Sequence, residues 1–193
     1  MKQLRQLDAL NIDYAGLVFG NNGFGETDIN VNALEEADLD VKLVGIFTNA
    51  EYEDIMAGVE NYGLNMVQLN GDESPFLCEK ISGEIEVIKT FRIENSDKLI
   101  DYKVIEYDEA CDYFLFKPAP GLTNHSLKVI GKSKIEKPFF LSGGFVPEDG
   151  KDILNFKHPD FLGIDLDDEN PDMPGIQNIP KLLAFLQSLK IKR

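Results

Sequence analysis

Short runs of apolar residues alternate along the chain with segments of helical pattern. Each apolar run is bounded by polar or turn residues, which is typical of a buried strand. The predicted strands are residues 12–19, 42–47, 66–69, 86–91, 113–116, 138–141 and 161–166. The predicted helices include residues 2–10, 52–62, 75–81 and 147–156. Strands that alternate with helices at this spacing are joined by crossover connections and pair in parallel.

The pattern predicts an α/β fold in one domain, residues 1–193, because the chain is long enough for one compact core. Hydrophobic residues make up 43% of the sequence and charged residues 27%, as in an ordinary globular protein. The pattern alone does not separate a closed barrel from an open, doubly wound sheet.

Charge and composition exclude several classes of partner. A formal net charge of −15 repels polyanions, so we expect no nucleic-acid partner. We expect no membrane span and a cytoplasmic location, because the apolar runs are short and the N-terminus lacks the apolar core of a secretory signal. Cys78 and Cys111 have no second thiol or histidine at ligand spacing, so we predict buried free thiols and no metal site.

Six sequence blocks follow one another along nearly the whole chain: IDYAGLVF at 12–19, VGIFTN at 44–49, VQLNGDE at 67–73, VIKTF at 87–91, FFLSGGFVP at 139–147, and GID at 163–165 followed by Pro174 and Gly175. In this order they resemble the blocks of the phosphoribosylanthranilate isomerase family. The third and fifth blocks are the most specific.

The resemblance implies a TIM-type (β/α)8 barrel that serves tryptophan biosynthesis without a cofactor. Such enzymes act on a small phosphorylated sugar–anthranilate substrate. They open the ribose ring and convert the aldose-derived imine to a ketose amine, an Amadori rearrangement. This reaction needs a general acid for the ring oxygen and a general base for the proton on the second carbon. In the family these are an aspartate at the end of the sixth strand and a cysteine at the end of the first.

Two departures concern this acid and base. The segment 1–10 aligns with the family's first helix, so the first strand and its cysteine would lie before Met1. We therefore expect seven strands and two unpaired edges, which a homodimer would cover. Lys117 stands where the family places its aspartate. We interpret it as a solvated or salt-bridged lysine, with a proton-shuttling or Schiff-base lysine as the alternative.

The family's phosphate site is kept in one half and replaced in the other. Gly143 and Gly144 keep the glycines of the seventh-strand loop, where backbone N–H groups hold a phosphate in this barrel class. A tight turn explains them equally well. After the eighth strand the family's Ser-Ser-Gly is replaced by Asp167, Asp168 and Glu169, and three adjacent carboxylates disfavour a dianion.

Other matched positions are polar. Gln68 and Asp165 are predicted to bind substrate at the barrel mouth, beside Glu73 and Lys89, and structural support of the barrel is the competing interpretation for all four. His125, in the loop after the sixth strand, is a further candidate, although a lone loop histidine is commonly solvated.

Three functions remain open at this point. The favoured one is a family member that has lost the isomerisation and acts as a binding, regulatory or assembly protein, since a site is removable from a fold. The second is a working isomerase with an upstream start. The third is different sugar chemistry centred on Lys117, which borohydride trapping would reveal.

Overall fold

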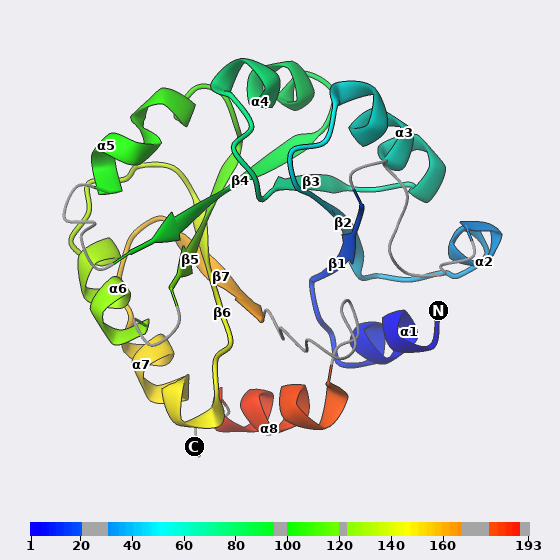
Figure 1. Ribbon diagram of the computed structural model, residues 1–193. Coiled ribbons are helices and arrows are strands. Elements are labelled where there is room, and N and C mark those ends of the chain that lie inside the picture. The colour runs from blue at the N-terminus through cyan, green and yellow to red at the C-terminus, as the bar shows by residue number, and fades with distance from the viewer. Residues whose placement is uncertain (21–30, 95–99, 120–122, 167–177, 190–193) are drawn as a thin grey trace. The chain divides into compact units, whose positions relative to one another are not determined.

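The computed structural model describes residues 1–20, 31–94, 100–119, 123–166 and 178–189, and these residues contain seven strands (Figure 1). The chain divides into two compact units. Unit 1 comprises Met1–Thr90 with Tyr107–Tyr113, and unit 2 comprises Phe91–Glu106 with Phe114–Arg193. Each unit is described by itself.

Unit 1 holds parallel strands that follow one another in chain order. Each strand is followed by a helix, as the alternating pattern predicts. The strands are β1 (Tyr14–Val18), β2 (Lys42–Phe47), β3 (Met66–Leu69) and the first part of β4 (Glu86–Ile93). The helices are α1 (Lys2–Ala9), α2 (Val31–Glu35), α3 (Tyr52–Tyr62) and α4 (Pro75–Ser82).

One face of the unit 1 strands is covered by helices. Phe47 at the end of β2 is fully buried and stacks on Phe19 with ring centroids 4.5 Å apart. A Cβ atom added at Gly58 of α3 would lie 2.9 Å from the Phe47 ring, so α3 packs closely on this face. Because side chains alternate along a strand, Ile46 belongs to the opposite face, and the register places Gln68 of β3 beside it.

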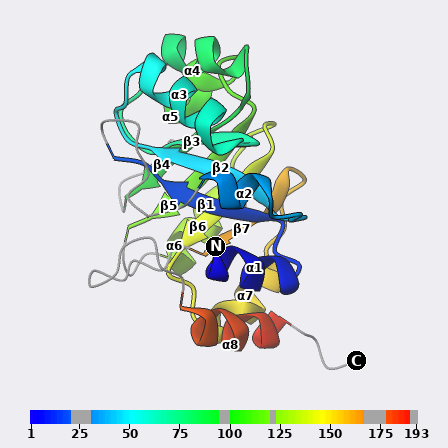
Figure 2. The ribbon, with the colours of Figure 1, turned by 90° about the vertical axis from the view of Figure 1, so that its right-hand side faces the viewer.

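Unit 2 holds the remaining strands, which also pair in parallel and in chain order. The strands are β5 (Tyr113–Pro118), β6 (Phe139–Gly143) and β7 (Phe161–Leu166). The helices are α5 (Ile100–Val104), α6 (Thr123–Ile130), α7 (Gly150–Asn155) and α8 (Ile179–Leu189), with short 3-10 turns η1 (Ile105–Tyr107) and η2 (Pro147–Asp149). Figure 2 shows α7 and α8 side by side, and a Cβ atom at Gly150 of α7 would contact Ser188 of α8.

Aromatic rings fill the helix-covered face of unit 2. Phe139 of β6 is fully buried and lies 5.3 Å from Phe116 of β5 and 5.9 Å from Phe161 of β7, between ring centroids. Phe156, which follows α7, packs against it at 6.4 Å. Such aromatic pairs add to the stability gained from burial. The opposite face of β5 and β6 therefore carries Leu115 and Phe140, which are neighbours in the register.

The predicted strands are confirmed, and three of them run further than their apolar cores. Strand β4 continues to Ile93, β5 to Pro118 and β6 to Gly143. The segment 147–156 is a 3-10 turn followed by α7 rather than one continuous helix. Among the described residues, β1 and β7 stand at the two ends of the strand order.

The structure tests one prediction made from composition. Cys78 and Cys111 are buried free thiols, as predicted. Across the described part of the chain, no helix is both long enough and apolar enough to cross a bilayer. The same residues contain no group of three or more His, Cys, Asp or Glu side chains placed to hold a metal ion.

Candidate functional site at the strand ends

Unit 1 carries a hydrogen-bonded polar cluster at the carboxyl ends of β3 and β4. Gln68 Nε2 donates to Asn70 Oδ1 at 2.9 Å, and Thr90 Oγ1 donates to the same oxygen at 2.6 Å. The register pairs Gln68 with Ile88, so alternation places Gln68 and Thr90 on the face opposite the helices. Gln68 and Thr90 are each 7% exposed, and Asn70 is half-buried. This cluster presents amide and hydroxyl groups at the strand ends.

A buried ion pair lies behind that cluster, on the helix-covered face. Lys89 is paired in register with Leu69, which is itself paired with Phe47 of the helix-covered face. Lys89 Nζ lies 2.9 Å from Glu73 Oε2 and also donates to the carbonyl oxygens of Leu69 at 3.3 Å and Gly71 at 2.7 Å. The ammonium therefore has at least three oxygen partners, which are enough for its three N–H donors.

Glu73 is equally well satisfied. Its Oε1 atom accepts hydrogen bonds from the backbone N–H groups of Asn49 at 2.8 Å and Gly71 at 3.1 Å. The phenol of Tyr107 donates to the Glu73 carbonyl at 3.1 Å. These contacts tie the segments after β2 and β3 to β4. We therefore assign Glu73 and Lys89 to structural support of the strand ends.

Cys78 of α4 lies near this ion pair and is not an activated nucleophile. Burial raises the pKa of the Cys78 thiol to about 11, and the nearby Lys89 charge offsets only part of that rise. The thiolate is the reactive form of cysteine, so the buried thiol is unreactive at neutral pH.

Replacing Gly71 with alanine is expected to destabilise the protein by about 1–3 kcal/mol, because the site has no room for a methyl group. A Cβ atom at Gly71 would lie 2.8 Å from the Asn49 backbone nitrogen and would displace the Asn49 side chain, whose Oδ1 accepts from Asp72 N–H. Gly83→Ala is the matched control, since its Cβ meets nothing closer than 3.5 Å. Urea unfolding measures the stability of both variants. A Gly71→Ala protein as stable as the Gly83→Ala protein would show that the Asn49–Gly71 contact is not tight.

Unit 2 carries a second polar row, at the carboxyl ends of β5, β6 and β7. Ser142 is paired with Asp165 in register, and its Oγ atom donates to Asp165 Oδ2 at 2.8 Å. Phe116 is paired with Leu141, so the register continued by one residue places Lys117 beside Ser142. Lys117, Ser142 and Asp165 therefore occupy one face, opposite the aromatic core. Ser142 is 1% exposed, whereas Lys117 and Asp165 are half-buried.

The predicted phosphate glycines occupy the turn after β6. Gly143 ends the strand, half-buried, and Gly144 is exposed. The Phe145 N–H group donates to the Gly143 carbonyl at 2.8 Å, which closes a tight turn. A Cβ atom at Gly143 would find its nearest neighbour at 3.6 Å, so packing does not require glycine there.

Other predicted positions are outside the described part of the chain. The acidic run Asp167, Asp168 and Glu169 and the Pro174–Gly175 pair fall in residues 167–177. His125 belongs to α6, and its side chain is not described.

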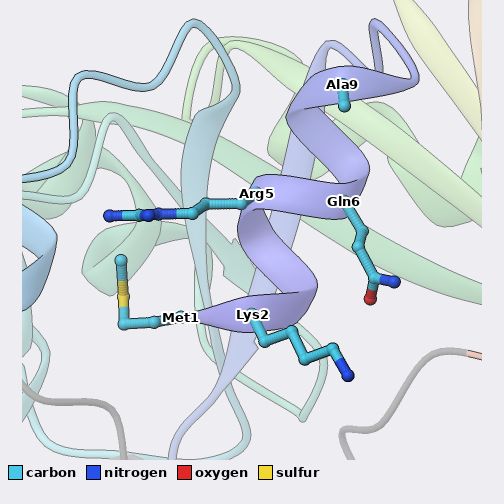
Figure 3. Close-up of a pocket in the computed structure, with 5 residues that line it drawn as sticks. All are labelled: Met1, Lys2, Arg5, Gln6 and Ala9. Carbon is cyan, nitrogen blue, oxygen red and sulfur yellow. The ribbon is translucent and has the colours of Figure 1, made fainter.

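A hollow on α1 is separate from the strand ends. Figure 3 shows its lining, in which the side chains of Lys2 and Gln6 extend away from that of Arg5. All five lining residues come from the start of the chain and α1: Met1, Lys2, Arg5, Gln6 and Ala9. No strand end contributes to it, so it is not part of the candidate site.

Three residues of the polar rows were not among the predicted substrate-binding residues: Asn70, Thr90 and Ser142. The signal for two of them is the period of two along a strand. Asn70 follows Gln68 by two residues, and Ser142 follows Phe140 by two, so each points to the face of its predecessor. Thr90 could be assigned to the polar cluster only from its hydrogen bond to Asn70 in the structure.

Parallel strands joined by helices, with polar side chains gathered at the carboxyl ends of the strands, define a protein of the (β/α) barrel class. Solved structures support the same fold. A Thermotoga maritima phosphoribosyl anthranilate isomerase aligns with a TM-score of 0.74 at 24% identity, covering 96% of this chain and 93% of that one. A Thermus thermophilus isomerase aligns with a TM-score of 0.73 at 22% identity, covering 100% and 94%.

A family model described as N-(5'phosphoribosyl)anthranilate (PRA) isomerase matches residues 13–188. The N-(5'-phosphoribosyl)anthranilate isomerase of Parabacteroides distasonis is 34% identical, with 97% of this chain and 88% of the relative covered. That of Phocaeicola vulgatus is 28% identical, with 99% and 94% covered. The chain belongs to the PRA isomerase family, and the resemblance inferred from the sequence blocks is confirmed.

Proposed function

We propose that this member of the PRA isomerase family does not carry out the Amadori rearrangement at the rate of an intact isomerase and acts as a binding barrel. The observation that carries the proposal is Lys117 at the end of β5. It occupies the place that the family gives to its general acid, on the same face as Ser142 and Asp165.

A lysine at this position cannot replace the general acid of the isomerase reaction, for two reasons. An ordinary lysine ammonium has a pKa of about 10.4 and is a poor proton donor near neutral pH, where a matched general acid contributes roughly 10²–10⁴-fold to the rate. Opening the ribose ring also creates a positively charged imine. A carboxylate stabilises that charge, whereas an ammonium group repels it.

The sequence after β7 supports the same conclusion. In the sequence, Asp167, Asp168 and Glu169 replace the Ser-Ser-Gly segment with which the family binds the substrate phosphate. Repulsion between these carboxylates and a phosphate dianion weakens binding of the dianion. The proposed ligand class is therefore a sugar or sugar–aromatic amine that is less anionic than the isomerase substrate.

A working isomerase is the second candidate, favoured by the 34% identity to a relative named as the isomerase. The proposed homodimer, in which a second copy pairs with the edge strands β1 or β7, is compatible with either function.

The binding barrel and the working isomerase are distinguished by an assay of turnover. The assay follows freshly generated N-(5'-phosphoribosyl)anthranilate as loss of anthranilate fluorescence. Three proteins are compared: the 193-residue chain, the same chain extended upstream with a first strand from the Parabacteroides distasonis isomerase, and that isomerase itself. We expect both forms of this chain to be at least about 100-fold slower than the relative. An extended form as fast as the relative would establish the working isomerase and overturn the proposal.

A further inference from the structure

Lys117 lies in an arrangement that suits covalent capture of a carbonyl group. The β5–β6 register, continued by one residue beyond Phe116 and Leu141, places it beside Ser142, whose Oγ–H donates to Asp165 Oδ2 at 2.8 Å. Because that hydrogen points to the carboxylate, the lone pairs of Ser142 Oγ can accept a hydrogen bond from another group. The row Lys117–Ser142–Asp165 thus places an amine, a hydroxyl group and a carboxylate on one face of three adjacent strands.

The geometry points to Lys117 as a Schiff-base lysine that captures the open-chain aldehyde of an aldose or aldose phosphate. The amine attacks as the neutral free base, the minor form of an ordinary lysine near neutral pH, after releasing its proton to water. The Nζ atom then bonds to the aldehyde carbon, while the carbonyl electron pair moves to oxygen.

The step balances without an oxidant, a reductant or a cofactor. The carbonyl oxygen takes up the proton that the amine released and forms a carbinolamine. The carbinolamine nitrogen then gives up a second proton, which the Asp165–Ser142 pair passes to the hydroxyl oxygen. The nitrogen lone pair that this frees expels the oxygen as water. One lysine ammonium and one aldehyde become one protonated imine and one water.

The surroundings of Lys117 fit a small polar substrate. Lys117 is half-buried at the end of β5, so part of the residue is exposed to solvent. Phe140, one layer below on the same face of β6, is also half-buried and offers an apolar surface to the carbon chain of a sugar. This inference goes beyond the proposed function, because capture of an aldehyde requires neither the isomerase substrate nor its acid–base pair.

Borohydride trapping tests the inference directly. The full chain is incubated with ribose 5-phosphate, and separately with unphosphorylated ribose, then reduced with sodium borohydride and digested for peptide mass spectrometry. We expect one reduced pentose adduct on Lys117, at least about tenfold above its level on any other lysine. Comparison of the two sugars shows whether the phosphate contributes.

Three variants serve as controls. Lys117→Arg keeps the positive charge and removes the adduct, whereas Lys128→Arg on the exposed part of α6 leaves it unchanged. Ser142→Ala slows adduct formation severalfold while Lys117 remains present. Adducts spread evenly over surface lysines, or no adduct on Lys117 in the unaltered chain, would overturn the inference. The readout is the mass of a covalent adduct on a peptide. A negative result can therefore be told apart from a negative result in the isomerase assay.

Discussion

Replacing Glu73 with alanine is expected to lower the free energy of unfolding by about 3–5 kcal/mol, because it leaves the Lys89 charge buried without its partner. Both side chains are almost fully buried, and their charged atoms lie 2.9 Å apart. The substitution also removes the acceptor of two backbone N–H groups, those of Asn49 and Gly71. Urea unfolding followed by circular dichroism measures the loss.

Two further variants show whether the effect is electrostatic. Glu79→Ala, on the exposed side of α4, is the matched control and is expected to change the stability by no more than about 0.5 kcal/mol. In the double variant Glu73→Ala/Lys89→Met no buried charge is left unpaired, so part of the lost stability is expected to return. A Glu73→Ala protein as stable as the Glu79→Ala protein would contradict the assignment of the pair as structural support.

The strands could be predicted because each is an apolar run bounded by turn residues. Met66–Leu69 is buried along its whole length, as expected for a parallel strand covered on both faces. The short helices α5 and α6 carry no comparable signal, since five to eight residues give little helical periodicity.

The polar contacts could be predicted only in part. The sequence singled out Gln68, Glu73, Lys89 and Asp165, but their pairing depends on which strands become neighbours. Lys89 meets Glu73 across 16 residues, and Asp165 accepts from Ser142 across 23. Periodicity assigns a side chain to a face of a strand, whereas its partner follows from register.

Other contacts could not be predicted at all. Asp8 of α1 accepts hydrogen bonds from the backbone N–H groups of Asp40 and Val41, more than 30 residues away. This carboxylate fixes the entry into β2, yet in the sequence it is one acidic residue among many. Nothing in local pattern distinguishes it from the other acidic residues.

Replacing Lys117 with aspartate is expected to raise isomerase turnover about 100-fold in the chain extended upstream with a first strand. The substitution returns a carboxyl group to the end of β5, where it protonates the ring oxygen and stabilises the imine charge. The same variant loses the borohydride-trapped adduct, because the amine is gone. Both effects follow from the position of one side chain beside Ser142 and Asp165.

Lys128→Asp is the matched control, since it makes the same change of charge on the exposed surface of α6 and is expected to leave turnover unchanged. Thermal unfolding of each protein verifies that the fold is retained. The most direct test is therefore the ratio of turnover by the Lys117→Asp variant to turnover by the unsubstituted extended chain. We predict a ratio near 100, and a ratio near one would show that Lys117 is not what separates this chain from an active isomerase.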